Sequence, residues 1–341
     1  MVKYKVLLVA LPLILQGCFS MQGASALAFF SNLDKTGRWK VHPKSDFEQR
    51  ILNGDVECVS CELFVADTNS GSMVLYRTME KCWDKGGVEI RNEMRDSSGK
   101  VLYSRNSRTE DGYLVERNVV YGKKSSSLQM EKKDDDGSPV REYRLVNKEG
   151  SLVLEDYRVN FHLGEKGNMD RGGIFFPFRQ EMDFTYDQSD SLTLIALQAS
   201  PRAYHVEFSY DPVVHKPMET SVTFDGKLYS YKLEKYNSAG KVVELYYSDD
   251  ITMDNEHVKY TYNESGSTLT VESGGIKRQE VYADGLLQRE EYFDYGGKIR
   301  LVARVELDAS GNVVQSTYEL PDPKKNKGMP LKLYKYSLKY N

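Results

Sequence analysis

Polar and apolar residues alternate along most of the chain, with few stretches of helical spacing. Residues 259–262, 289–293 and 331–340 each place charged side chains at every second position and Tyr, Leu or Val between them. A period of two is typical of a strand that has one face in water and the other packed. The alternation therefore predicts an all-β protein with little helix.

The Asp/Asn-x-x-Gly tetrad recurs between these alternating runs. An Asp or Asn side chain caps a type I turn, and the glycine takes the left-handed conformation that closes a hairpin. Several glycines are 12 to 14 residues apart, which one strand and one turn would occupy. The spacing predicts an antiparallel β-meander, with turns at residues 96–99, 134–137, 147–150, 237–240, 263–266, 294–297 and 308–311, and shorter ones at 225–226 and 284–285.

The predicted organisation has a cysteine-bearing N-terminal β module over residues 34–95 and the meander over residues 96–341. Within the module, residues 46–52 are expected to form one short helix. We expect the meander to be a large twisted or curved sheet. The sequence does not decide whether this sheet forms a half-barrel or a solenoid-like stack.

The chain begins with a segment that differs from everything after it. Lys3 and Lys5 precede the apolar run 6–15, which is too short to span a bilayer comfortably. Residues 15–18, Leu-Gln-Gly-Cys, resemble the lipobox of bacterial lipoproteins, whose cysteine becomes the lipidated N-terminus. The resemblance implies a signal peptide over residues 1–17 and acyl chains on Cys18, which would hold the protein on a membrane.

Two other outcomes for this segment stay open. The signal could be cleaved after Ala26 or Ala28, or it could remain as an uncleaved anchor; each alternative still exports the chain. Residues 18–33 would form a tether. Phe19 stands where lipoproteins retained at the inner membrane carry aspartate, so the resemblance implies a lipid-anchored protein of the outer membrane that faces the periplasm.

Composition narrows the classes of partner. The formal net charge is −4, and it becomes −6 without Lys3 and Lys5. No basic patch interleaved with aromatics is present, so we expect no nucleic-acid binding. Hydrophobic residues make up 40% of the chain, which is enough for a packed core. Twenty-four tyrosines against two tryptophans fit a strand-rich protein.

Export of the chain determines the redox environment in which its cysteines are interpreted. If Cys18 carries lipid, an odd number remains: Cys58, Cys61 and Cys82. An oxidising periplasm favours one disulfide, from Cys82 to either Cys58 or Cys61, and one buried thiol. The Cys-x-x-Cys spacing also fits redox or zinc sites, but the flanking residues read as strands, and His42 is the one histidine nearby.

The search for catalytic chemistry is largely negative. The chain has no Gly-x-Ser-x-Gly elbow, no phosphate-binding loop and no His-Glu-x-x-His. His205 and His215 could flank one hairpin near Glu207 or Asp211, but we expect them to be ordinary strand and loop histidines rather than a catalytic or metal site. The acidic run 134–136 is expected to be a solvated turn rather than a calcium site. We predict no catalytic residue, metal or cofactor.

Two weak likenesses concern the body of the chain. Residues 236–243 and 307–314 resemble units of the YD-type repeats of bacterial surface proteins, without their strict period. The order of strands and turns over residues 204–231 is similar to that in the lipoprotein-carrier half-barrels of the Gram-negative periplasm. Neither likeness assigns a site.

Three functions follow as hypotheses. The first is a non-enzymatic binding or scaffold module on the envelope, with a protein partner that its tyrosine-rich faces would contact. The second is a carrier of lipid or another hydrophobic ligand, with Phe175, Phe176 and Phe178 as cavity candidates. The third is an envelope hydrolase whose site is assembled from distant residues.

Overall fold

The computed structural model describes residues 33–41, 43–48, 50–135, 138–176, 178–199, 202–224, 226–249, 254–263, 265–273, 276–294, 296–322 and 330–341. The signal segment, most of the predicted tether and the proposed lipidation site Cys18 lie outside these ranges. Among the described residues, no helix has the length and hydrophobicity that crossing a bilayer requires.

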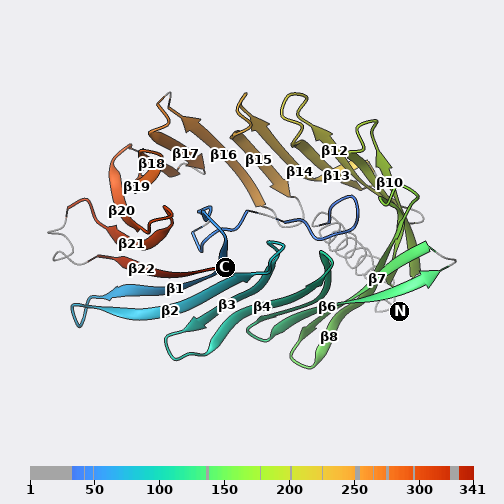
Figure 1. Ribbon diagram of the computed structural model, residues 1–341, viewed down its shortest axis with the longest axis horizontal. Helices are drawn as coiled ribbons and strands as arrows, with labels where there is room; N and C mark the ends of the chain where they lie inside the picture. Colours follow the sequence, from blue (N-terminus) through green and yellow to red (C-terminus); the bar gives the residue numbers. More distant parts are fainter. Residues whose placement is uncertain are drawn as a thin grey trace, which may run out of the picture.

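The chain forms a single antiparallel barrel. Each strand pairs with the next one along the sequence, and the last strand pairs with the first, so the sheet closes (Figure 1). The strands are β1 (Val56–Asp67), β2 (Ser72–Trp83), β3 (Glu89–Asp96), β4 (Val101–Glu110), β5 (Tyr113–Tyr121), β6 (Lys124–Asp135), β7 (Ser138–Glu149), β8 (Leu152–Leu163), β9 (Met169–Phe176), β10 (Phe178–Tyr186), β11 (Leu192–Ala199), β12 (Arg202–Tyr210), β13 (Pro217–Phe224), β14 (Lys227–Tyr236), β15 (Val242–Asp249), β16 (Asp254–Tyr262), β17 (Thr268–Ser273), β18 (Ile276–Ala283), β19 (Leu286–Phe293), β20 (Ile299–Leu307), β21 (Val313–Glu319) and β22 (Lys332–Tyr340).

The prediction of an all-β antiparallel meander is therefore confirmed, and the open question of closure is answered by a complete ring of 22 strands. Strands β1, β2 and β3 come from the stretch predicted to be a separate N-terminal module. They pair with β22 and β4 and so belong to the same sheet as the rest.

Most of the predicted turns have the expected geometry. In the tetrads that begin at residues 96, 237, 263, 294 and 308, the glycine amide donates to the carbonyl of the first residue over 2.8–3.0 Å. The glycines have φ between 68° and 88°, where a side chain would be strained. Asn147 is different, because it lies inside β7 and the turn follows at Gly150. The tetrad 134–137 is described only in part.

The inward face of the barrel is apolar over much of its circumference. One core cluster lies along β5–β12 and includes Tyr143, Phe161, Met182 and Ile195, each 1% exposed or less. A second cluster lies where the barrel closes, around Val59 and other side chains of β1, β2, β21 and β22. Apolar burial of this extent is the main stabilising term of the fold.

Residues 33–55 run through the interior of the ring, seen as the blue trace in Figure 1. Leu33 and Trp39 pack against the first core cluster, and Phe47 and Leu52 pack against the second. The helix expected at 46–52 does not form. The Asp46 carboxylate instead accepts the amides of Glu48 and Arg50 over 2.8 and 2.9 Å, and this fixes a turn.

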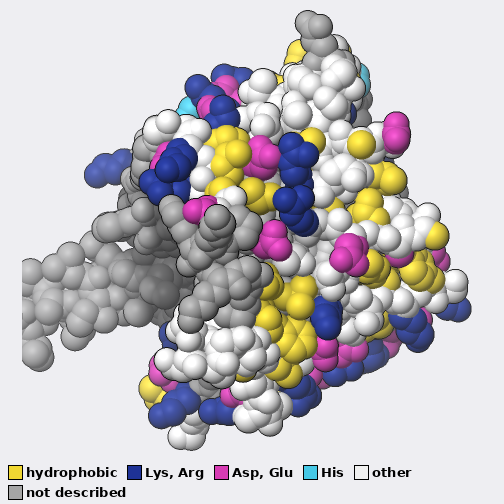
Figure 2. All heavy atoms as spheres, turned by 90° about the vertical axis from the view of Figure 1, so that its left-hand side faces the viewer, with side chains coloured by type: hydrophobic (Ala, Val, Ile, Leu, Met, Phe, Trp, Pro, Cys, Tyr) yellow, Lys and Arg dark blue, Asp and Glu magenta, His cyan; other side chains and the backbone are white. Residues whose placement is uncertain are grey.

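The outward face of the strands is polar. Cross-strand partners share a face of the sheet, so the buried residues fix which positions point outward. Outward positions carry ion pairs, at strand centres in the case of Arg144 with Asp156 at 2.6 Å and near strand ends in the case of Lys235 with Glu244 at 2.6 Å. Acidic and basic side chains are interspersed with apolar ones over the side that Figure 2 shows.

Candidate functional site

The internal segment and the wall formed by β2–β5 enclose a cavity of about 290 Å³. The segment contributes Trp39, Lys40, Pro43 and Ser45. The wall contributes Lys81, Trp83, Gly87, Val88, Glu89, Asn92, Arg105 and Arg117. We call this cavity the luminal pocket and treat it as the candidate binding site.

The end of the internal segment nearer Leu33 is held by a turn and by the barrel rim. The Asp34 carboxylate accepts the backbone amides of Thr36 and Arg38 over 2.8 and 3.0 Å. The Trp39 amide then donates to the carbonyl of Gly112, in the β4–β5 turn, over 3.1 Å. These contacts set the direction of the segment and place the Trp39 ring against Arg117, whose guanidinium carbon is 4.2 Å from the ring centroid.

The other end of the segment is anchored by a buried charge network, which we call the Arg50 clamp. The Arg50 guanidinium is 12% exposed and lies 3.1 Å from Asp46 and 3.5 Å from Glu290 of β19. It also forms an ion pair with Glu48 and donates to the Ser316 hydroxyl over 3.2 Å. The clamp joins the segment to β19 and β21 through groups that are nearly inaccessible to water.

Tyrosines of the closing strands complete the clamp. The Tyr318 hydroxyl donates to one oxygen of Glu48, and the Tyr336 hydroxyl donates to the other over 3.2 Å. Burial raises the pKa of the Glu48 carboxyl, although Arg50 and the Tyr318 hydroxyl act in the opposite direction. Burial also raises the pKa of Tyr336. Every polar group named here has a partner, so we interpret the clamp as a structural contact that holds the internal segment against the barrel wall.

Unlike the Arg50 clamp, the luminal pocket has positive charges that are not fully balanced by carboxylates. Glu89 pairs with Arg105, whose Nε lies 3.0 Å from the carboxylate. Lys81 and Arg117 also line the pocket, and burial lowers the pKa of the lysine and takes that of the Arg117 guanidinium to about 10. Charges that are desolvated without full compensation favour an anion in the same space.

A second cavity adjoins the luminal pocket at the barrel rim. It encloses about 900 Å³ between the internal segment and the turns at Asp84–Gly87 and Asp111–Gly112. The two cavities share Trp39, Lys40 and Val88 in their linings. The two cavities are therefore neighbours on either side of Trp39 and Lys40.

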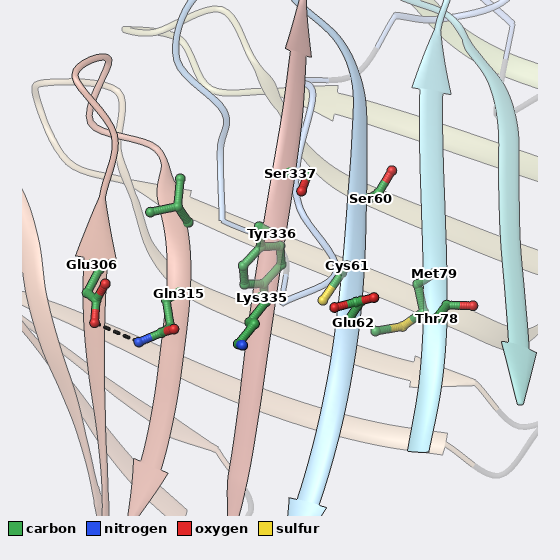
Figure 3. Close-up of a pocket in the computed structure, with 11 residues that line it drawn as sticks. Ser60, Cys61, Glu62, Thr78, Met79, Glu306, Gln315, Lys335, Tyr336 and Ser337 are labelled. Atoms are coloured by element: carbon green, nitrogen blue, oxygen red, sulfur yellow. Dashed lines mark hydrogen bonds between the residues drawn. The ribbon is translucent and has the colours of Figure 1, made fainter. Parts of the chain in front are cut away.

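A third hollow lies on the outward face of β20–β22, β1 and β2 and encloses about 640 Å³ (Figure 3). Its polar side chains include Glu62, Glu306, Gln315 and Lys335, and the Gln315 amide donates to Glu306 over 2.6 Å. A mixture of acids, an amide and a lysine on an outward face is typical of an ordinary solvated surface. We assign no function to this hollow.

The cysteines predicted to form a disulfide are all in β1 and β2. Cys58 and Cys82 face each other in the register of the two strands and form the bond, while Cys61 is a buried free thiol. Of the two pairings considered, the structure therefore has Cys58–Cys82. Burial raises the pKa of the Cys61 thiol, which disfavours the thiolate that a redox or metal role requires.

The other candidates from the sequence are not brought together. Phe175 and Phe176 end β9 and Phe178 begins β10, but their side chains are outside the described part. His205 is in the middle of β12, whereas His215 lies in the following turn, about 17 Å farther along at the rise of a strand. No group of His, Cys, Asp or Glu among the described residues has the arrangement of a metal site.

Sequence reasoning missed the luminal pocket and the internal segment. Residues of β2 at the inward parity include Met79, Lys81 and Trp83, so a lysine interrupts an otherwise apolar face. Arg105 and Arg117 interrupt the inward faces of β4 and β5 in the same way. The sequence does contain a signal for the pocket, namely a charged residue at a strand position where the alternation predicts an apolar one. These charged residues indicate a common site only when the pairing of β2, β3, β4 and β5 is known.

Comparison with known proteins adds little to this description. No protein-family model matches the chain, and no curated protein matches its sequence. Among solved structures, a porin-like protein from Bacteroides uniformis ATCC 8492 is similar with a TM-score of 0.32 and 12% identity, covering 84% of this chain and 99% of its own. A porin-like protein from Bacteroides vulgatus ATCC 8482 has a TM-score of 0.25 and 10% identity, covering 85% and 99%. Scores this low support no inference about function.

Proposed function

We propose that this chain is a non-enzymatic binding protein of the bacterial envelope. A lipid on Cys18 tethers it to the outer membrane, and its barrel stands in the periplasmic water. The polar outward face of the strands is the observation that carries this proposal.

A barrel embedded in a bilayer needs an outward apolar band about 25 Å tall, and a lysine or arginine facing lipid at mid-depth costs about 2–4 kcal/mol. Here Arg144 and Asp156 lie at the centres of β7 and β8 and face outward. Lys235, Glu244 and His257 form a similar outward group across β14–β16. Arg144 and Asp156 at strand centres suit water rather than hydrocarbon, and Lys235 near the end of β14 with Glu244 adds to the charge on the outward face.

The internal segment supports the tether in a second way. Residues 33–55 begin where the predicted tether ends, and they are fixed inside the barrel by the Arg50 clamp and two core clusters. A pull on the lipid anchor would thus be transmitted to buried contacts rather than to a frayed terminus.

Subcellular fractionation of a Cys18→Ser variant tests the proposal. The native chain should sediment with membranes and dissolve only in detergent, while the variant should appear in the soluble periplasmic fraction. Cys61→Ser is the matched control, because it also removes one thiol and should stay with the membrane. A Cys18→Ser protein that still needs detergent, although intact mass shows that residues 1–17 have been removed, would show that the barrel itself is embedded.

A further inference from the structure

The luminal pocket holds more positive than negative charge. Four cationic side chains line it, from Lys40, Lys81, Arg105 and Arg117, against the single carboxylate of Glu89 among its lining residues. Glu89 is engaged by Arg105. At least two cations thus face the space without a carboxylate that could balance them locally.

The present contacts of these cations are neutral. The Lys81 side chain is nearly buried, and its ammonium donates to the Asp46 carbonyl over 2.9 Å. Arg117 donates from Nε to the Ser107 hydroxyl over 3.1 Å and stacks on Trp39. In the described part of the chain, no carboxylate lies within ion-pair distance of either residue.

The sequence preceding the internal segment cannot supply the missing charge. Residues 1–32 contain no aspartate or glutamate, and the first acid of the chain is Asp34. The carboxylate of Asp46, the nearest acid on the segment, is paired with Arg50 in the clamp. Among the described residues, no carboxylate is thus available to balance Lys81 and Arg117, and an anion from solution could do so.

We infer that the luminal pocket binds the anionic group of a small molecule, a phosphate or a carboxylate. The planar guanidinium of Arg117 can bind two oxygens of such a group, and Lys81 supplies a point charge. A volume of about 290 Å³ is at the lower end for ligand sites, so the pocket suits a small metabolite or a lipid head group. This inference deepens the proposed binding function by naming its ligand class.

Titration calorimetry of the full-length protein in a mild non-ionic detergent tests the pocket. Inorganic phosphate and succinate are the free anions. Dihexanoyl phosphatidylglycerol is the lipid probe, and dihexanoyl phosphatidylcholine is its control with a head group of no net charge. We expect at least one anion to bind, with affinity that falls as salt is raised. Preference for the free anions would identify a soluble ligand, and preference for phosphatidylglycerol a lipid head group.

Three variants make the result specific to the pocket. Arg117→Gln should weaken the anion at least tenfold, since it removes a charged hydrogen-bond donor. Arg108→Gln removes the same charge from the outward face of β4, where Arg108 pairs with Glu110 and Glu116, and should change affinity less than twofold. Glu89→Gln should strengthen binding several-fold, because it frees Arg105; a variant with a merely damaged fold would not bind more tightly.

Absence of binding by every anionic probe at 10 mM would overturn the inference, as would equal affinity of Arg117→Gln and Arg108→Gln or no gain from Glu89→Gln. Failure here is distinct from failure of the proposed function. Calorimetry in detergent reports on the pocket whether or not the barrel stands in water, and fractionation reports on the barrel whether or not the pocket is occupied.

Discussion

Replacing Arg50 with methionine should destabilise the protein more than any surface charge change. Arg50 is 12% exposed, and the carboxylates of Asp46 and Glu290 beside it are each 3% exposed. Without the guanidinium, Asp46, Glu48 and Glu290 would each lose the cation that they pair with in the clamp. Breaking a buried charge pair typically costs 3–5 kcal/mol.

The size of the loss should depend on pH. Burial already raises the pKa of Glu48 in the native protein, and Arg50 is one of the groups that oppose the rise. In Arg50→Met the opposing charge is lost, so the pKa of Glu48 in the folded protein rises further above its value in the unfolded chain. An acid with a raised folded pKa contributes stability below its unfolded pKa and loses it as pH rises through the folded value. The variant should be closest to native stability near pH 5 and weakest near pH 8.

Thermal unfolding followed by tryptophan fluorescence measures this loss, because Trp39 belongs to the internal segment and Trp83 lines the same pocket. A loss of 3–5 kcal/mol in a chain of this length lowers the midpoint by about 5 °C or more. Arg304→Met is the control, since Arg304 is 68% exposed in a surface pair worth at most about 1 kcal/mol. Equal midpoints for the two variants, or a loss that does not change with pH, would refute the role given to the clamp.

Two further predictions concern packing and the cysteines. Gly37→Ala should cost about 2 kcal/mol more than Gly71→Ala in chemical denaturation. Both glycines have positive φ, but a Cβ at Gly37 would clash with the Phe161 ring, while nothing lies within 4 Å of one at Gly71. Comparable losses would contradict the internal packing of the segment. Cys61 should react with a thiol reagent only after unfolding, given its burial, and reduction of the disulfide should cost about 3 kcal/mol for its 24-residue loop. Rapid labelling of Cys61 in the folded protein would show that its site is open.

The sequence predicts the local elements of this fold better than their assembly. The tetrads at 96, 237, 263, 294 and 308 were identified because capping and a left-handed glycine are local chemistry. The pairing of β1 with β22 joins residues nearly three hundred positions apart, and no turn signal records it. Closure follows instead from the summed twist and length of the sheet, which alternation alone does not specify.

The helix expected at 46–52 is an error with a clear cause. Asp46 caps the local amides and Arg50 turns back to Asp46, while Phe47 and Leu52 are drawn into the second core cluster. Tertiary packing and a side-chain cap thus outweigh helical propensity over so short a stretch. The luminal pocket escaped detection for a related reason, because its cations come from separate strands and meet only in the closed barrel.

Labelling of outward positions tests the central claim, that the barrel stands in water, most directly. Gln129→Cys and Glu272→Cys place thiols at outward positions of β6 and β17, and the native Cys61 is the inward control. In isolated membranes without detergent, a water-soluble maleimide should modify both introduced thiols completely and leave Cys61 unmodified. Labelling of the introduced thiols only after detergent is added would mean that the outward face is covered by lipid, and would contradict the account.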